Sequence, residues 1–322
     1  MSVSEFESRL NQWGREQVPF LFLVDFEMEN LLVWKMNETP DGILFSIGDV
    51  SNAFSTVRNS NTALLTKHPI SFSEYKPKFD FVKDRIRFGD SYLANLTIKT
   101  KIEINRSLED LFFESVAKYK LCWKNKFLVF SPETFIKIND KKIYSFPMKG
   151  TIDASLPNAE KVIVSDEKEL SEHVTIVDLI RNDLSAVAKN VNVNRFRYIE
   201  KIRTNQKNLL QVSSEIAGNL PDDYRNYIGS TLISLLPAGS ISGAPKKKTI
   251  QIIQETEREK RGYYTGVFGY FDGMNLDSAV MIRFIEQEGE NFYYRSGGGI
   301  TAQSEAKKEY QEAIDKIYVP IH

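Results

Sequence analysis

The pattern of apolar and polar positions in the first half of the chain predicts short strands joined by polar turns. Val18–Met28 (VPFLFLVDFEM) and Asp41–Gly48 (DGILFSIG) are rich in aromatic and β-branched residues and indicate strands. Helical spacing of apolar residues predicts a helix over Leu108–Trp123. Lys126–Asp140 and Lys141–Met148 are then expected to pair as an antiparallel hairpin that turns at Asn139-Asp140.

The second half of the chain mixes longer helical and strand-like segments. Helices are predicted over Ser171–Asn190, over Asp222–Leu236 and from about Ser304 to Ile317, and Pro245 is expected at the first position of another helix. The remaining segments, VNVNRFRYIEKI, YYTGVFGYFDG and LDSAVMIRFIEQEGENFYYRSGGGI, read as strands, the last with a turn at Glu288-Gly289-Glu290. Long strands, hairpins and flanking helices favour an α+β class over a parallel βαβ sheet. No linker or repeat divides the chain, so we expect one large domain over residues 1–322.

Composition and charge exclude several classes of protein. The net charge is −1 with no basic tail, which disfavours nucleic-acid binding. The single cysteine, Cys122, cannot form an internal disulfide, and we interpret it as an inert thiol in a reducing compartment. The N-terminus lacks the apolar core of a signal peptide, and the longest apolar run, Phe20–Val24, is too short to span a bilayer. The expected location is therefore cytoplasmic, without membrane contact.

A Gly-rich stretch at Leu235–Ile253, LLPAGSISGAPKKKTIQII, raises the possibility of a phosphate-binding loop. A P-loop needs two glycines with four residues between them, followed at once by Lys and Ser or Thr, directly after a strand. Here three residues separate Gly239 from Gly243, Lys246 follows three positions later, and the preceding segment reads as helix. The spacing argues against nucleotide binding, and a Gly-rich helix entry with solvated lysines would be the default if the stretch stood alone.

Four other segments carry residues suited to chemistry. FPMKGT places Lys149 in an apolar setting before Gly150 and Thr151, and SEHVTIVDLIRND carries Glu172 at an expected helix start. DSAVMIRF places Arg283 within an apolar strand, where a charge is rarely buried without a partner. RSGGGITAQSEAKKEYQEAIDK joins a triple-Gly turn to a helix that carries Glu309, Glu312 and Lys316.

In this order and spacing, these segments resemble the chorismate-utilising enzymes. The resemblance runs from about Gly89 (GDSYLANL) to the C-terminus, with residues 1–85 as a shortened, divergent N-terminal part and 86–322 as the catalytic core. It implies two antiparallel sheets packed together and flanked by helices. Within the family, the resemblance is greatest to aminodeoxychorismate synthases, because Lys149 in PMKGT matches the lysine of their PIKGT motif, where anthranilate synthases have alanine.

The resemblance implies a Mg²⁺ site and two subsites for the carboxylates of chorismate. Glu172 and Glu312 would hold Mg²⁺ against the ring carboxylate, with Glu309 close by; Mg²⁺ prefers such carboxylate ligands. Glu309 and Glu312 lie three residues apart, on one face of the expected helix. The remaining substrate-binding residues implied are Arg283 and Tyr264 at the enolpyruvyl carboxylate, the Gly297–Gly299 turn (Gly297 and Gly298) as backbone donors, Ser240, Gly150, Thr151 and Lys316.

The resemblance assigns catalysis to Lys149. The amine would attack ring carbon 2 and expel the 4-hydroxyl, after which ammonia adds at carbon 4 and the lysine leaves. No Gly-x-Cys-x-Gly motif for glutamine hydrolysis is present, so a separate glutamine amidotransferase is expected to supply ammonia. Without the resemblance, two other interpretations stay open. Lys149 would be an ordinary surface lysine between a strand and a turn, and the three glutamates would be solvated helix residues.

Two positions depart from the family pattern. Leu93 stands where water-adding members carry a lysine and amine-adding members commonly carry glutamine, and Leu210 stands where many members have histidine. The proton donor to the leaving hydroxyl is therefore open, and Glu133 of SPETF is our candidate. Anthranilate synthase component I and a non-catalytic chorismate-binding protein remain as alternative functions to aminodeoxychorismate synthase component I.

Overall fold

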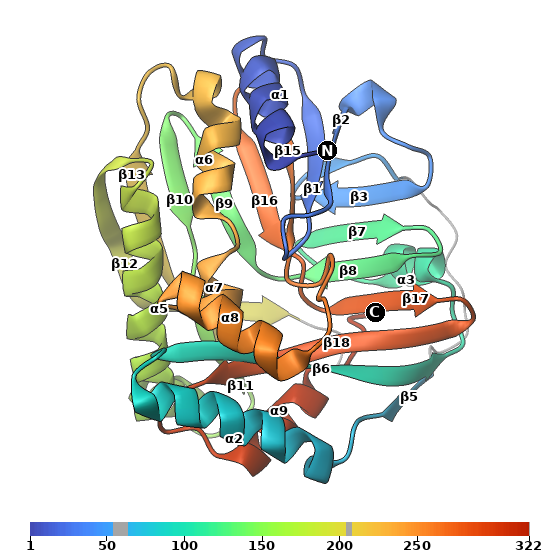
Figure 1. The fold of residues 1–322 in the computed structure, drawn as a ribbon, viewed down its shortest axis with the longest axis vertical. Coiled ribbons are helices and arrows are strands. Elements are labelled where there is room, and N and C mark those ends of the chain that lie inside the picture. Colours follow the sequence, from blue (N-terminus) through green and yellow to red (C-terminus); the bar gives the residue numbers. More distant parts are fainter. Residues whose placement is uncertain (54–63, 204–207, 322) are drawn as a thin grey trace. The chain divides into compact units, whose positions relative to one another are not determined.

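The structure is a computed structural model that describes residues 1–53, 64–203 and 208–321. Within these ranges the chain forms two nine-stranded sheets, and every pairing between their strands is antiparallel (Figure 1). Helices of various lengths connect the strands. The predicted α+β class with two antiparallel sheets is confirmed. No helix in the described ranges is both long and apolar enough to cross a membrane.

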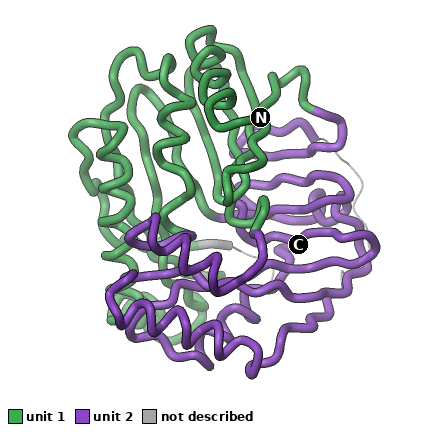
Figure 2. The backbone as a smooth tube through the Cα atoms, in the orientation of Figure 1, with its two compact units in different colours: residues 1–39, 133–240, 261–280 green, residues 40–132, 241–260, 281–322 purple. Residues whose placement is uncertain are grey.

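The chain divides into two compact units, each built on one of the sheets (Figure 2). The first unit contains residues 1–39, 133–240 and 261–280, and the second contains residues 40–132, 241–260 and 281–322. Both units are therefore assembled from separated stretches of sequence. The packing of the sheets into one domain over 1–322, and the division at residue 85, stay predictions.

The sheet of the first unit has the strand order β11–β13–β10–β9–β16–β15–β1–β2, and β12 pairs with the other edge of β13. Burial explains why one of its inner strands is so apolar: all five residues of β1 (Phe20–Val24, FLFLV), which pairs with β15 and β2, are buried. The other strands are β2 (Leu31–Lys35), β9 (Thr134–Asn139), β10 (Lys142–Ser145), β11 (Met148–Asp153), β12 (Lys189–Arg203), β13 (Asn208–Asn219), β15 (Val267–Phe271) and β16 (Leu276–Val280).

The helices of the first unit begin at identifiable caps. In α1 (Val3–Arg15), Ser2 and Glu5 form a capping box, and α5 (Glu167–Ser185) begins after Asp166, whose side chain accepts the backbone N–H of Glu169. Helix α5 contacts β11, β12 and β13. The remaining helices are η1 (Met36–Glu38), α4 (Ala159–Ser165), η2 (Tyr224–Tyr227) and α6 (Ile228–Leu235), and the short α7 (Gly239–Ser242) begins in this unit.

The sheet of the second unit has the order β14–β6–β18–β17–β8–β7–β3–β4, with β5 on β6. Its longest strands are β6 (Leu93–Ile104) and β18 (Asn291–Ile300), which pair along nine residues from Phe292↔Ile102 to Ile300↔Ala94. The others are β3 (Ile43–Ile47), β4 (Val50–Ser51), β5 (Leu65–His68), β7 (Tyr119–Trp123), β8 (Phe127–Ser131), β14 (Gly243–Ala244) and β17 (Phe284–Glu288).

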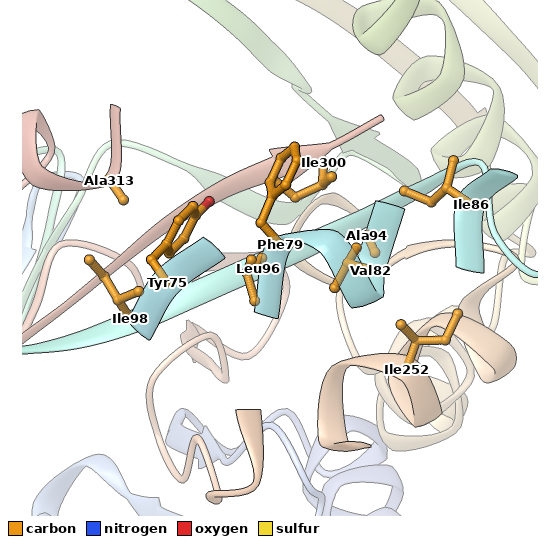
Figure 3. Packing of buried hydrophobic residues seen from close by; sticks show 10 residues of the cluster. All are labelled: Tyr75, Phe79, Val82, Ile86, Ala94, Leu96, Ile98, Ile252, Ile300 and Ala313. Carbon is orange, nitrogen blue, oxygen red and sulfur yellow. The ribbon is translucent and has the colours of Figure 1, made fainter. Parts of the chain in front are cut away.

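Three helices cover the β6–β18 part of this sheet and share a hydrophobic core with it (Figure 3). They are α2 (Phe72–Phe88), α8 (Lys246–Glu257) and α9 (Ala306–Asp315); the shorter α3 (Leu108–Glu114) packs on β7 and β8. The core cluster consists of Tyr75, Phe79, Val82 and Ile86 of α2, Ala94, Leu96 and Ile98 of β6, Ile252 of α8, Ile300 of β18 and Ala313 of α9. This core fixes α9 on the strand that carries the triple glycine.

Several predicted elements have different bounds in the structure. The helix predicted over Leu108–Trp123 ends at Glu114, because Tyr119–Trp123 pairs between β3 and β8. The strand predicted over Lys126–Asp140 is split at Pro132, with β8 in one sheet and β9 in the other. The β9–β10 hairpin turns at Asp140-Lys141, one residue later than predicted, with φ of 48° and 60° at these residues. Pro245 is the N-cap of α8 rather than its first residue.

Candidate active site

Lys149 lies in a β-bulge of β11. Met148 pairs with Ser213 and Thr151 pairs with Gln211, so β11 has one more residue than β13 between these pairs. Gly150 provides the bend with a φ of 81°, a conformation that residues with a Cβ rarely adopt. A bulge re-aims the side chains next to it, and here it directs Lys149 to Glu172 on α5. Thr151, on the exposed side of the bulge, is solvent-accessible.

The ammonium of Lys149 and the carboxylate of Glu172 form an ion pair, with Nζ 3.5 Å from Oε2. Glu172 is 6% exposed at its side chain and Lys149 is 19% exposed. The structure therefore joins the predicted nucleophile to one predicted metal ligand. The prediction that Glu172 lies at a helix start is wrong, because α5 begins five residues earlier, at Glu167.

His173, the residue after Glu172, lies almost fully buried between α5 and β13. Its Nε2 is 2.6 Å from Oγ of Ser214, and the same Oγ accepts the backbone N–H of Arg197 at 2.9 Å. Burial, followed by the charges of Arg197 and Lys149, lowers the pKa of His173 to about 4. The imidazole is therefore neutral at physiological pH, and it links α5 to β13 through its hydrogen bond with Ser214.

Glu133 and Ser240 contact each other in the first unit. The hydroxyl of Ser240 donates a hydrogen bond to Oε1 of Glu133. Both residues line a small pocket that is otherwise mostly apolar and includes the carboxylate-bearing Asp183. Ser240, predicted as a donor to substrate, thus donates to the candidate acid. The backbone at Gly239 is tightly packed beside it, since a Cβ there would lie 3.1 Å from Oδ2 of Asp183 and would push that side chain by a few tenths of an ångström.

Tyr264 of the first unit is 3% exposed, in the turn before β15. Its backbone N–H donates to the carbonyl of Arg261 at 3.1 Å. The neighbouring turn residues are also held, since Glu27 accepts the N–H groups of Arg261 and Gly262 at 2.9 and 3.0 Å. The tyrosine predicted to contact substrate is therefore on a rigid turn.

The triple glycine of the second unit is strand, not turn. Gly297, Gly298 and Gly299 belong to β18 and pair with Thr97, Leu96 and Asn95 of β6. Glycine is needed at 297 because a Cβ there would lie 2.3 Å from the carbonyl oxygen of Leu96. The expected turn with free backbone donors is wrong, because the long β6 strand continues past the glycines and pairs with them.

Side chains of α9 converge on Gly298. A Cβ at this position would lie 3.2 Å from Oε1 of Glu312, 3.6 Å from Oε2 of Glu309 and 3.6 Å from Nζ of Lys316. Lys316 donates to Oε1 of Glu312 at 2.6 Å and to the carbonyl of Gly297 at 2.9 Å. Glu309 is 2% exposed. The glycine thus forms the floor of a cradle bounded by two carboxylates and an ammonium.

Two neighbouring carboxylates fit Mg²⁺, which is commonly bound by one or two protein carboxylates while it keeps several waters. Glu309 and Glu312 supply such a pair, and Glu172 belongs to the first unit. Among the described residues, no group of three His, Cys, Asp or Glu side chains is assembled that could hold a metal. The three-glutamate site therefore stays a prediction, whereas the pair on α9 is present.

Tyr75 of α2 borders the same carboxylates. Burial, then the charges of Glu309 and Glu312, raises the pKa of the Tyr75 phenol. The hydroxyl therefore stays protonated, and Tyr75 also belongs to the core cluster of Figure 3. The sequence alone gave no sign of this residue, since α2 lies outside every chemistry-bearing motif.

The prediction that Arg283 lies within a strand is wrong. The residue lies between β16 and β17, with a φ of 55°. Its Nη1 donates to the carbonyl of Lys316 at 2.9 Å, and its guanidinium lies 4.8 Å from the ring centre of Tyr318. Nε is buried and has no hydrogen-bond partner among the described residues. The strand breaks here because Val280 ends the first unit's sheet and Phe284 begins pairing in the second.

The two departures from the family pattern are both buried core positions. Leu93 is 2% exposed at the start of β6, and its carbonyl oxygen would lie 1.9 Å from a Cβ on Gly243. Leu210 is 2% exposed on β13, opposite Ile152 of β11. Neither side chain can move a proton, so any acid or base must come from other residues.

A family model described as chorismate binding enzyme matches residues 30–322. The chain belongs to the chorismate-binding enzyme family. This assignment agrees with the convergence of Glu309, Glu312 and Lys316 on Gly298 and with the pairing of Lys149 and Glu172.

Relatives of the chain differ in how far their names describe an activity. It is 50% identical over 99% of its length to an "Uncharacterized PabA-like protein" of Haemophilus influenzae, covering 98% of that protein. It is 31% identical to aminodeoxychorismate synthase component 1 of Bacillus subtilis and 30% identical to anthranilate synthase component 1 of Acetivibrio thermocellus. These matches cover 78% and 88% of this chain but only 55% and 56% of the relatives. The chain spans about half the length of the two relatives with named activities.

The fold also resembles that of a solved structure. The structure of the menaquinone-specific isochorismate synthase of Escherichia coli superposes with a TM-score of 0.72 at 16% identity, covering 98% of this chain and 81% of that one. At this identity the likeness concerns the fold alone.

Proposed function

We propose that the protein is an aminodeoxychorismate synthase component I, which converts chorismate and ammonia to 4-amino-4-deoxychorismate. The observation that carries the proposal is the setting of Lys149. A strand bulge aims the side chain at α5, where it is mostly enclosed yet accessible, beside Glu172. A lysine built into a bulge with a left-handed glycine is an arrangement for presenting an amine, which an ordinary surface lysine does not need.

In the proposed reaction, the neutral amine of Lys149 forms a bond to ring carbon 2. Both conjugated ring double bonds shift by one position, from carbons 1 and 2 to carbons 1 and 6 and from carbons 5 and 6 to carbons 4 and 5; the bond from carbon 4 to its hydroxyl breaks, and the departing oxygen takes a proton to leave as water. Ammonia then bonds to carbon 4, both double bonds shift back, and Lys149 leaves carbon 2 with its electron pair. The amine that has joined carbon 4 gives up one proton, which balances the proton used by the leaving group.

Proton transfer to the leaving oxygen is assigned to Glu133. A carboxylic acid is a suitable donor when its environment is partly apolar, and the pocket that Glu133 lines consists mainly of apolar side chains. Ser240 holds one oxygen of this carboxyl through its hydroxyl. The neutral His173 does not serve as the acid, because the low pKa of its imidazole leaves it without a proton to give.

Substrate binding is assigned to residues of the second unit. Arg283 would take the enolpyruvyl carboxylate, and Lys316 would add positive charge near the ring carboxylate. When bound to Glu309 and Glu312, Mg²⁺ would neutralise the ring carboxylate. The two carboxylates and the ammonium of Lys316, which converge on Gly298, support this assignment.

Ammonia is proposed to come from a separate glutamine amidotransferase. Hydrolysis of glutamine by a cysteine needs a reactive thiolate, and the sequence has a single cysteine. Burial raises the pKa of that thiol, Cys122, to about 12, and it packs inside the core of the second unit. The chain itself therefore has no group for this hydrolysis.

The test is to incubate the purified protein with chorismate, Mg²⁺ and an ammonium salt and to identify products by mass spectrometry. We expect 4-amino-4-deoxychorismate from the wild type and loss of at least about a hundredfold in rate for Lys149→Ala. Lys161→Ala, which removes an exposed lysine of α4, is the matched control and should be fully active. Isochorismate as the main product, or full activity of Lys149→Ala, would refute the proposal.

Anthranilate synthase component I is the second candidate, because a named relative of that activity matches this chain as well as the aminodeoxychorismate synthase does. The same assay separates the two, since anthranilate is fluorescent and forms with release of pyruvate. Anthranilate as main product, with Lys149→Ala unaffected, would establish this alternative.

A further inference from the structure

The C-terminal segment after α9, residues 316–321, contacts Arg283 at two points. The carbonyl of Lys316 accepts a hydrogen bond from Nη1 at 2.9 Å, and the ring of Tyr318 lies 4.8 Å from the guanidinium carbon. Arg283 and this segment belong to the same unit. The segment is therefore placed to determine where the guanidinium lies.

Arg283 needs such support because its backbone is in the left-handed region, with a φ of 55°. For residues with a side chain this conformation is energetically unfavourable, and they keep it only where their surroundings enforce it. One enforcing contact is with the backbone, since the N–H of Phe130 donates to the carbonyl of Arg283 at 3.2 Å. The others are the two contacts of the C-terminal segment with the side chain.

The C-terminal segment is itself fixed. The hydroxyl of the fully buried Tyr294 donates to the carbonyl of Tyr318 at 3.0 Å, and the N–H of Val116 donates to the carbonyl of Pro320 at 2.7 Å. Ile317 is fully buried in the core next to them. The ring of Tyr318 is 40% exposed, so packing into that core does not explain its place over the guanidinium.

These contacts leave one edge of the guanidinium available. Nη1 is used by Lys316, whereas Nε is buried and has no hydrogen-bond partner among the described residues. A buried N–H donor without an acceptor is costly, and a carboxylate ligand is the natural acceptor for a guanidinium edge. The arrangement thus prepares Arg283 for a carboxylate before the ligand arrives.

We propose that Tyr318 is a positioning residue for Arg283: its ring holds the guanidinium so that the Nε edge meets a carboxylate of the substrate. The proposal rests on the proposed role of Arg283 in binding chorismate. An arginine side chain that is ordered beforehand loses less conformational freedom when it binds, and this shows as affinity. Tyr318 touches no reacting atom in this proposal and acts only through Arg283.

The first test is the affinity for chorismate with Mg²⁺ present and ammonia absent, measured by isothermal titration calorimetry. Tyr318→Ala should raise Kd about three- to fivefold, the effect of one exposed cation–π contact. Tyr318→Phe, which keeps the ring, should bind as the wild type does. Phe88→Ala removes an exposed ring of the same unit and is the matched control. In turnover assays, KM should rise in Tyr318→Ala while kcat changes by less than about twofold.

The second test separates positioning from a general structural effect. In an Arg283→Ala background, Tyr318→Ala should weaken chorismate binding no further, because the residue it positions is gone. Equal losses from Tyr318→Ala in both backgrounds, or wild-type affinity of Tyr318→Ala, would overturn the inference. Since binding is measured without ammonia, a wild type that binds chorismate but makes no aminated product would refute the proposed function, and the Tyr318 variants would still decide the inference.

Discussion

Replacement of Gly298 by alanine adds one methyl group at the point where Glu309, Glu312 and Lys316 converge. The new Cβ would lie 3.2 Å from Oε1 of Glu312, closer than most Cβ contacts, and 3.6 Å from the two other side chains. All three neighbours are the ends of flexible side chains, so they can move by a few tenths of an ångström. The strand itself should form normally, because β18 and β6 pair on both sides of this residue.

The expected effect is therefore on metal binding rather than on folding. Displacement of groups that orient metal ligands typically lowers metal affinity by about 10–100-fold, and we expect Gly298→Ala to fall in this range for Mg²⁺. Its free energy of unfolding should change by less than about 1 kcal/mol, since alanine loses less chain entropy than glycine on folding. Metal affinity is measured by Mg²⁺ titration of chorismate turnover and by calorimetry, and stability by urea denaturation.

Two other glycines of the same unit provide the controls. Gly42→Ala has open space around the new Cβ and should leave both properties unchanged, whereas at Gly297 a Cβ would lie 2.3 Å from the carbonyl of Leu96. Gly297→Ala should therefore destabilise the fold by about 1–3 kcal/mol. Wild-type Mg²⁺ dependence in a folded Gly298→Ala protein would refute the cradle.

Three further predictions test separate parts of the structure. First, the pKa of His173 falls from an ordinary 6.5 to about 4 on folding, so the unfolded chain binds the extra proton between these values and the folded protein loses stability as pH falls through that window. The loss in the free energy of unfolding should reach up to about 3 kcal/mol, measured by urea denaturation at pH 6.5, 5.5 and 4.5. His173→Gln should remove this pH dependence, whereas His68→Gln, at an exposed site, should leave it unchanged. Second, Glu257 accepts hydrogen bonds from the N–H and the hydroxyl of Thr97 at 2.9 and 2.8 Å in a buried setting. Glu257→Ala should therefore lower the free energy of unfolding by about 1–3 kcal/mol, whereas Glu255→Ala, on the exposed side of α8, should change it little. Equal stability of the two variants would contradict the importance of these buried hydrogen bonds. Third, Glu133→Gln should reduce kcat for chorismate amination about 10²–10⁴-fold with little change in KM, and unchanged kcat would remove Glu133 as the proton donor.

Elements with a strong local pattern could be predicted from the sequence. The apolar run around Phe20–Val24 forms a buried strand, and the amphipathic segment that carries Glu172 and His173 forms α5, because both patterns persist over at least one full element. Their ends were less well predicted, since α5 begins at Glu167, after its Asp166 cap and five residues before Glu172. Helix α2 was not predicted, although Ser71 and Glu74 form a capping box at its start.

Features set by partners distant in sequence could not be predicted. The glycines at 297–299 look like a turn in isolation, yet they lie in a strand because β6, about 200 residues earlier, pairs with them. The same holds for Tyr119–Trp123, where helical spacing of apolar residues gave way to pairing on both edges of β7. The pattern of apolar residues along one segment indicates which of its faces is buried. It does not indicate which distant segment will pair with its backbone.

Lys149 shows how the two kinds of information combine. The motif FPMKGT identifies the residue, but its direction depends on the register of β11 against β13, which contains one extra residue on the lysine's side. Without the bulge, the strict alternation of a strand would put neighbouring side chains on opposite faces, so a shift of one residue would turn Lys149 away from Glu172. Gly150 makes the extra residue possible through its φ of 81°. The glycine after the lysine therefore has a physical role that the motif alone does not reveal: it sets the face of the sheet on which the amine is presented.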